Sequence, residues 1–233
     1  GTMLGAIRHK GFIPWDDDMD FGVPRNYYDR LINTLEKELP KRYKCYTYQT
    51  NKAVKSPFAK ITDTTTRIND PRINLPIKEQ IGINIDIFPL DYCEYNNKKI
   101  KKIHRLEKLR QVIYIQPPHK SPIKSFIKFC LRLICPVSNR YLIRKSISIA
   151  SNIENGNHLG NIFGRWKMKE IIPIDWYGEG VRYKFSSITL CGRKDYDKYL
   201  KRLYNNYMEL PDAIDRQCHT TDMYYYNDNE KNV

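Results

Sequence analysis

The chain has 233 residues, 41% of them hydrophobic, which is enough to bury one substantial core. Its 40 Lys and Arg against 26 Asp and Glu give a net charge of +14, which favours an anionic partner such as a nucleotide diphosphate, nucleic acid or an acidic membrane face. It shows no secretory signal and no apolar run of ~20 residues, which argues against a membrane span and predicts a cytoplasmic protein.

The chain opens with a short segment from Gly1 to His9 that reads as a helical turn. Thr2 is placed to cap it, and Arg8 and His9 lie near its far end. Backbone amides at the start of a helix suit phosphate groups. The segment therefore predicts a phosphate-binding turn.

An acidic cluster follows at residues 16–20, which read Asp-Asp-Asp-Met-Asp. Along an extended strand alternate side chains share a face, so Asp16, Asp18 and Asp20 would lie together while Asp17 points away in a helper or turn role. Such a row of anions repels itself unless a cation is present, and carboxylates are ligands of Mg²⁺. The cluster predicts a metal–nucleotide site, with a solvated acidic loop as the alternative.

A helix and three strands are predicted next. The helix begins at Pro24 and ends before Pro40, because apolar residues between them recur at helical spacing. The strands are rich in β-branched and aromatic residues. They cover residues 43–49, 58–66 and 81–88.

The third of these strands carries Asp86. There Ile83, Ile85 and Ile87 fall on one face, and Asn84 and Asp86 on the other. Asp86 would then emerge beside the acidic cluster as a third carboxylate, unless it is a satisfied polar residue at a strand end.

Residues 97 to about 155 show helical patterns rich in Lys and Arg, interrupted by prolines. Within them, Ile123–Ile134 mixes apolar bulk with cations, as interfacial helices do. Two interpretations stand. Either this segment makes peripheral contact with an anionic membrane at its inner face, or its apolar face packs against the remaining protein and the lysines are solvated.

The C-terminal part predicts strands at 181–185 and 187–190 after a turn with Gly178 and Gly180, and a helix at 195–207 with an apolar stripe. The Tyr224–Tyr226 run and the Asn-rich tail are expected to fray. Six scattered cysteines indicate free thiols, and Cys218-His219 alone does not predict zinc.

The whole run from Gly1 to Asp20 resembles the LicD family, relatives of fukutin and fukutin-related protein in the nucleotidyltransferase superfamily. The resemblance continues at Phe58–Ile61, at Asn84–Asp91, and at Tyr204–Pro211 with His219 following; Asn205-Asn206 stand where this last motif usually reads Tyr-Gly-Asp. It implies an α+β fold with a nucleotidyltransferase-like mixed sheet flanked by helices and a basic helical annex. The expected parts are a catalytic core at 1–96, the basic helical region at 97–160, and strands and a helix at 161–233 that complete the same domain.

The resemblance also implies a metal-dependent phosphotransferase. Such an enzyme moves a phospho-alcohol, phosphocholine-like or ribitol-phosphate-like, from a CDP-linked donor to a sugar hydroxyl of a glycan or lipid-linked glycan, as in lipopolysaccharide, capsule or teichoic acid biosynthesis. Asp18, Asp20 and Asp86 resemble the triad that holds one or two Mg²⁺ or Mn²⁺ ions, with Asp16 in support and Asp86 as either ligand or base. The residues expected to contact substrate are Gly1, Thr2, Arg8, His9 and Lys60.

Two other functions compete with this one. A nucleotidyltransferase acting on RNA, protein or a small molecule would use the same metal chemistry, and a non-catalytic module would only bind nucleotide or glycan. Intact carboxylates argue against the module. The sequence has no RNP-type aromatic motif, KH loop or zinc knuckle, which argues against a nucleic-acid partner.

Overall fold

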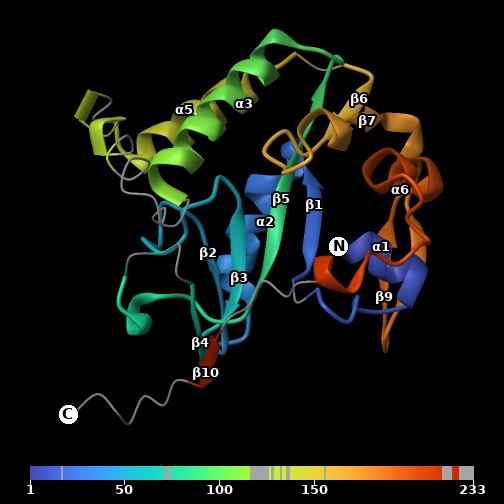
Figure 1. Ribbon diagram of the computed structural model, residues 1–233, viewed down its shortest axis with the longest axis horizontal. Helices are drawn as coiled ribbons and strands as arrows, with labels where there is room; N and C mark the ends of the chain where they lie inside the picture. Colours follow the sequence, from blue (N-terminus) through green and yellow to red (C-terminus); the bar gives the residue numbers. More distant parts are fainter. Residues whose placement is uncertain are drawn as a thin grey trace.

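The computed structural model describes residues 1–16, 18–70, 73, 75–115, 126, 129–131, 133–134, 137–154, 156–216 and 222–225. Within them six strands form the main sheet, in the order β2-β3-β5-β6-β7 with β1 paired to β5 (Figure 1). β1 runs parallel to β5, and the other pairs are antiparallel, so the sheet is mixed and the predicted α+β class is confirmed. The strands are β1 (Asp20–Pro24), β2 (Tyr43–Tyr46), β3 (Ala59–Asp63), β5 (Asn84–Cys93), β6 (His158–Gly160) and β7 (Ile172–Pro173).

Helix α2 (Arg25–Glu38) covers one face of this sheet, as Figure 1 shows. Its Tyr28 and Ile32 are buried against Ala59 and Ile87 in one apolar cluster. The Tyr28 hydroxyl accepts a hydrogen bond from the Ala59 amide (2.7 Å) and donates one to the Ile87 carbonyl (3.1 Å), which fixes α2 across β3 and β5. The alternate residues of the strands therefore face the side opposite α2.

A pair of packed helices, α3 (Lys98–Arg110) and α5 (Asn139–Ser151), forms the basic helical annex. Asn97 and Ser138 cap their N-termini through side-chain oxygens. The π-helical turn η3 (Gln111–Ile115) continues α3. Among the described helices, none has the length and apolar character needed to span a membrane.

The C-terminal elements follow the predicted order. The hairpin of β8 (Val181–Phe185) and β9 (Ile188–Gly192) and helix α6 (Tyr196–Tyr204) lie close to the predicted ranges. The apolar stripe of α6 buries Leu200 and Leu203 in a cluster that includes Leu4 of the N-terminal segment. Short 3-10 turns are η2 (Ile77–Glu79), η4 (Lys167–Glu170), η5 (Ile174–Trp176) and η6 (Ala213–Asp215).

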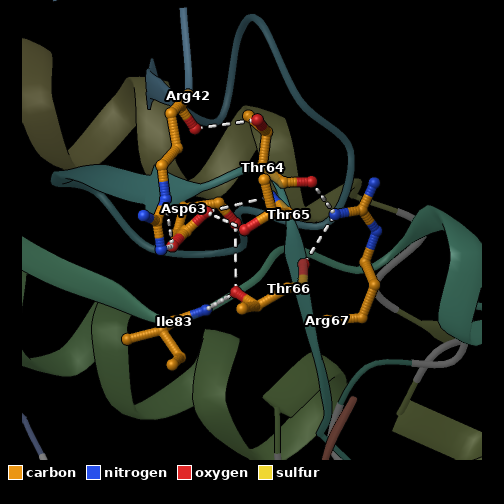
Figure 2. Close-up of polar contacts among 7 residues, drawn as sticks. All are labelled: Arg42, Asp63, Thr64, Thr65, Thr66, Arg67 and Ile83. Atoms are coloured by element: carbon orange, nitrogen blue, oxygen red, sulfur yellow. Dashed lines mark hydrogen bonds and ion pairs between the residues drawn. The ribbon is translucent and has the colours of Figure 1, made fainter. Parts of the chain in front are cut away.

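The strand predicted at 58–66 is wrong as one unit, because it breaks at a corner after Asp63 (Figure 2). The Asp63 carboxylate accepts hydrogen bonds from Arg42 and from the amide and hydroxyl of Thr65, which turns the chain into β4 (Thr66–Asn69). The Thr66 hydroxyl accepts from the Ile83 amide (2.9 Å) and donates to the Asp63 carbonyl. The corner is thereby tied to the chain that enters β5.

Three further predictions need correction. β5 begins only at Asn84, so Ile83 does not share the face of Ile85 and Ile87; its side chain is 44% exposed. The strand predicted at 43–49 ends at Tyr46, where a turn begins. The tail does not fray at 222–225, because β10 (Asp222–Tyr225) pairs antiparallel with β4.

Candidate functional site

Three polar residues form a row across the centre of the sheet. In the β1–β5 ladder Asp20 stands opposite Asp86, and in the β3–β5 ladder Lys60 stands opposite Asp86. Residues in register on neighbouring strands project to the same face. The Asp20–Asp86–Lys60 row therefore lies on the face opposite α2, and it brings together three residues that the sequence predicted separately.

Lys60 and Asp86 are joined by an ion pair. The Lys60 Nζ lies 2.5 Å from Asp86 Oδ1 and donates a second hydrogen bond to Asn84 Oδ1 at 2.9 Å. Both side chains of the pair are about four-fifths buried, with 21% and 16% of their surface exposed. The Lys60 ammonium thus neutralises the Asp86 carboxylate directly.

Asp20 lies at a point where negative charge accumulates. Although part of its surface is open to solvent, surrounding protein atoms raise the pKa of Asp20 to about 7, and the charges of Asp18 and Asp86 act in the same direction. The amine of Gly1 and the ammonium of Lys60 act in the opposite direction and do not cancel the shift. A positive charge close to Asp18 and Asp20 would be stabilised here.

The acidic cluster does not form the extended strand that the sequence predicted from Asp16. The Asp16 amide donates to the Ile13 carbonyl (2.9 Å) in a turn, and β1 begins only at Asp20. A Cβ on Gly1 would lie 2.0 Å from Asp16 Oδ2, so a larger residue at this position would require the Asp16 carboxylate to shift. Asp17 lies outside the described residues.

The carboxylate oxygens at this site are of a chemical type that suits a divalent cation. The oxygens of Asp18 and Asp20 are hard ligands, and the pKa of Asp20 is raised by surrounding protein atoms first and by the charge of Asp18 second. In the geometry described, however, no three His, Cys, Asp or Glu side chains among the described residues are placed to hold a metal ion together. Asp86 is paired with Lys60 instead.

The N-terminal segment is a short helix, α1 (Thr2–Leu4), that continues into the π-helical turn η1 (Gly5–His9). Thr2 is not its cap, because Gly1 occupies that position. The Thr2 hydroxyl accepts a hydrogen bond from the amide of Asp20 (2.9 Å). Thr2 therefore fixes the backbone at the first carboxylate of the row.

Arg8 is directed to the C-terminal loop, and His9 contacts Arg8 and Trp15. Arg8 Nη1 donates to the carbonyls of Tyr207 (2.8 Å) and Glu209 (3.0 Å), and its Nε donates to His9 Nε2 (3.0 Å). Burial and the Arg8 charge lower the pKa of His9, whose ring packs edge-on against Trp15. None of the hydrogen bonds described for Arg8 and His9 reaches the Asp20–Asp86–Lys60 row.

Two features near the row lie within the matched motifs but were given no functional role from the sequence. The rings of Phe58 and Phe88 lie 4.1 Å apart, and the Lys60 Nζ is 5.5 Å from the Phe58 ring, so an aromatic pair borders the row. The available signal was their spacing: Phe58 lies two residues before Lys60, directly before β3, and Phe88 lies two residues after Asp86 on β5. Burial and the charges of nearby acids, Asp16 first among them, raise the pKa of Tyr204 to about 12.

A depression of about 600 Å³ lies at the end of α6, lined by Asp197, Lys201, Asn205, Asn206, Tyr207 and Met208. Its lining contains no residue of the row. His219, which belongs to the same sequence motif, and Cys218 lie outside the described residues.

Comparisons with known proteins agree with the resemblance carried by these motifs. The chain is 27% identical over 230 residues to the lipopolysaccharide cholinephosphotransferase LicD of Haemophilus influenzae, across 94% of this chain and 84% of that protein. Uncharacterised proteins of Rickettsia prowazekii and Rickettsia typhi are each 65% identical to it over 23 residues, which is 10% of this chain and 9% and 7% of theirs. No solved structure matches the chain. Residues 1–123, more than half of the chain, match the family LicD/FKTN/FKRP, nucleotidyltransferase domain, and the chain therefore belongs to that family.

Proposed function

We propose that this protein is a metal-dependent phosphotransferase that moves a phospho-alcohol from a CDP-linked donor to a sugar hydroxyl of a cell-surface glycan. The observation that carries the proposal is the Asp20–Asp86–Lys60 row, with Asp18 beside it, in a chain of the LicD family. The similarity to a lipopolysaccharide cholinephosphotransferase supports a phosphocholine-like group and a glycan acceptor.

Asp18 and Asp20 are the residues we assign to a divalent cation, with Asp16 in support and Asp86 assigned to proton transfer. Mg²⁺ or Mn²⁺, when bound, supplies positive charge that neutralises the donor diphosphate and the charge developing on the leaving CMP. The charge that accumulates around Asp20 supports this assignment, because a cation would relieve it.

The transfer itself needs a proton acceptor for the glycan hydroxyl. Asp86 suits that role, because its ion pair with Lys60 favours the ionised carboxylate. The hydroxyl oxygen forms a bond to the phosphorus that carries the alcohol, and its proton passes to Asp86. The bond from that phosphorus to the bridging oxygen breaks, and its electron pair leaves with CMP.

The aromatic pair supports a place for the donor beside the row. Phe58 and Phe88 are half-buried aromatic residues next to Lys60, and we propose that a planar base stacks on one of their rings. Because one stacking contact is worth roughly 1–3 kcal/mol, we expect Phe88→Ala to raise KM for the donor about tenfold with a smaller change in kcat. Steady-state kinetics with varied donor checks this, and an unchanged KM would contradict it.

The function is tested with purified protein, Mg²⁺, and a panel of CDP-alcohols and nucleoside triphosphates, with products followed by phosphorus NMR. Release of CMP from a CDP-alcohol is the expected result. Release of pyrophosphate from a nucleoside triphosphate would instead identify a nucleotidyltransferase, and binding without turnover would identify a non-catalytic module.

The site is tested with Asp18→Asn and Asp20→Asn, which keep the size of each side chain and remove its charge. We expect each variant to lower CMP release by about 100-fold or more. Asp212→Asn, at an exposed position before η6, is the matched control and should keep full activity. If both site variants fold and release CMP at the unmutated rate, the metal assignment is wrong.

A further inference from the structure

The described residues between positions 126 and 134 include four large apolar residues that are exposed to solvent. Its described residues, 126, 129–131 and 133–134, are helical. The exposed fractions are 66% for Phe126, 57% for Phe129, 65% for Leu133 and 80% for Ile134. These four residues are spaced i, i+3, i+7 and i+8, which is the sequence pattern of one apolar helix face. An apolar face packed against the remaining protein would have buried them.

The neighbouring helices do not share this exposure. Ile100 and Ile103 of α3 and Ile143 of α5 are fully buried, and Leu142 of α5 is 3% exposed. Apart from Tyr141 of α5, helices α3 and α5 leave none of their large apolar side chains exposed. The open apolar face is a specific property of the 126–134 segment.

The outer surface of α3 is strongly positive. Its exposed cations are Lys98, Lys99, Lys101, Lys102, Arg105 and Lys108. Glu107, the acidic residue in this helix, is buried and paired with Arg110. No carboxylate of α3, all of whose residues are described, therefore offsets these charges on its surface.

Helix α5 continues the positive surface toward the apolar face. Arg140, Arg144 and Lys145 are exposed, and the sequence of α5 contains no acidic residue. Tyr141, in its first turn, is 52% exposed. Val137 directly precedes Ser138, the cap of α5. Ile134 is three residues before Val137, so the chain holds Ile134 within about 11 Å of Val137. In Figure 1 the described residues 126, 129–131 and 133–134 lie at the outer end of the α3–α5 pair.

We propose that the 126–134 face and the cations of α3 and α5 together form a docking surface for an anionic lipid membrane. Phe126, Phe129, Leu133 and Ile134 enter the boundary between headgroups and acyl chains, and the cations contact lipid phosphates. A bilayer offers both an apolar interior and a negative surface, whereas nucleic acid offers no apolar interior. A second copy of this chain also carries a net charge of +14, so two copies would repel each other.

The test is co-sedimentation of the full chain with vesicles of phosphatidylcholine alone or mixed with phosphatidylglycerol. We expect binding to the mixed vesicles at low salt, weak binding to phosphatidylcholine, and loss of binding at high salt. Absence of sedimentation with mixed vesicles at low salt would overturn the proposal.

A matched pair of variants separates the apolar contact from the charge. Leu133→Asp and Ile188→Asp make the same change in net charge at exposed apolar positions, but Ile188 lies on β9, at the opposite side of the molecule in Figure 1. We expect Leu133→Asp to weaken vesicle binding about tenfold and Ile188→Asp to change it little. Equal effects of the two variants would overturn the insertion of this face.

Two controls complete the design. Analytical ultracentrifugation without lipid is expected to show a species that Leu133→Asp does not alter; dissociation of a dimer by this variant would assign the face to a second copy and overturn the membrane proposal. CMP release from a soluble CDP-alcohol should be the same for Leu133→Asp and the unmutated chain. The proposed function can therefore fail or hold independently of vesicle binding.

Discussion

At the scale of single residues, Asp20 combines a place in the row with an electrostatic cost. Surrounding protein atoms and the charges of Asp18 and Asp86 all disfavour its ionised form, as its raised pKa indicates, although its surface is exposed. A carboxylate placed where its ionised form is disfavoured is typical of functional sites, in which residues needed for activity lower the stability of the fold.

Replacement of Asp20 should separate stability from activity. Asp20→Asn removes the repelled charge, so in the presence of a chelator at neutral or higher pH we expect a Tm about 2–4 °C higher than that of the unmutated chain, together with lost CMP release. Differential scanning calorimetry measures the shift. Asp212→Asn should leave the Tm unchanged, and a lower Tm for Asp20→Asn would contradict the repulsion.

Arg8 presents a second question at this scale, because its hydrogen bonds hold backbone rather than an open site. Arg8 Nη1 binds the carbonyls of Tyr207 and Glu209. We expect Arg8→Ala to free this loop, so that amides around residues 205–210 exchange hydrogen faster, as measured by mass spectrometry. Unchanged exchange together with a raised KM for the donor would show that Arg8 acts on substrate alone.

At the scale of elements, the corner after Asp63 sets the entry into β5. Arg42 binds the Asp63 carboxylate and holds its pKa well below its usual range, with help from Thr65. Gly82 fits against this corner, because a Cβ there would lie 2.2 Å from the Asp63 carbonyl oxygen. The corner therefore positions the strand that carries Asp86.

The corner predicts a pH-dependent contribution to stability. A carboxyl group with a lowered folded-state pKa stabilises the fold above its ordinary pKa of about 4, and this stabilisation is lost as the pH falls through the lower folded-state value. We expect Asp63→Ala to cost about 1–3 kcal/mol near neutral pH, and the difference to shrink on acidification below about pH 4. Urea unfolding at several pH values measures it, with Asp212→Ala as the exposed control; a constant difference would contradict the ionic contribution.

Elements with local signals were predictable, and those held by distant partners were not. The helix predicted from Pro24 was found at Arg25–Glu38, because apolar spacing and proline are local features. The pairing of β10 with β4 joins segments about 150 residues apart and leaves no local pattern. The break after Asp63 depended on side-chain hydrogen bonds to a turn, which strand propensity does not report.

The same division applies to the candidate site. Alternation along β5 placed Asp86 on the polar face, opposite Asp20. The Lys60–Asp86 ion pair and the bonds from Arg8 to residues 207 and 209 depend on which side chains meet in space, so a single sequence could not supply them.

At the scale of the whole molecule, a buried ion pair joins the helical annex to the sheet region. Glu107 and Arg110 of α3 form it with only 8% and 5% of their side chains exposed. Arg110 also donates to the Lys55 carbonyl, just before β3, and to Asn139 at the start of α5. The pair thus connects three parts of the chain.

Removal of one partner should be costly, and removal of both should not. Glu107→Ala leaves the Arg110 charge buried without its carboxylate, so we expect a loss of about 3–5 kcal/mol in the free energy of unfolding. The double variant Glu107→Leu/Arg110→Met should lie close to the unmutated chain in the same denaturant titration. If Glu107→Ala were as stable as the double variant, this result would show that water solvates the Arg110 charge once its carboxylate partner is removed.

The bonds from Arg8 to Tyr207 and Glu209 also determine when the molecule is completed during synthesis. They join residues 199 and 201 positions apart, so the N-terminal segment reaches its final contacts only after the last of these residues has left the ribosome. Pairing of β1 with β5 can occur earlier, once residue 90 has emerged. Contacts of such separation slow folding, because a long loop must close before they form. The carboxylates of the sheet are therefore synthesised early, and the N-terminal segment beside them is fixed last.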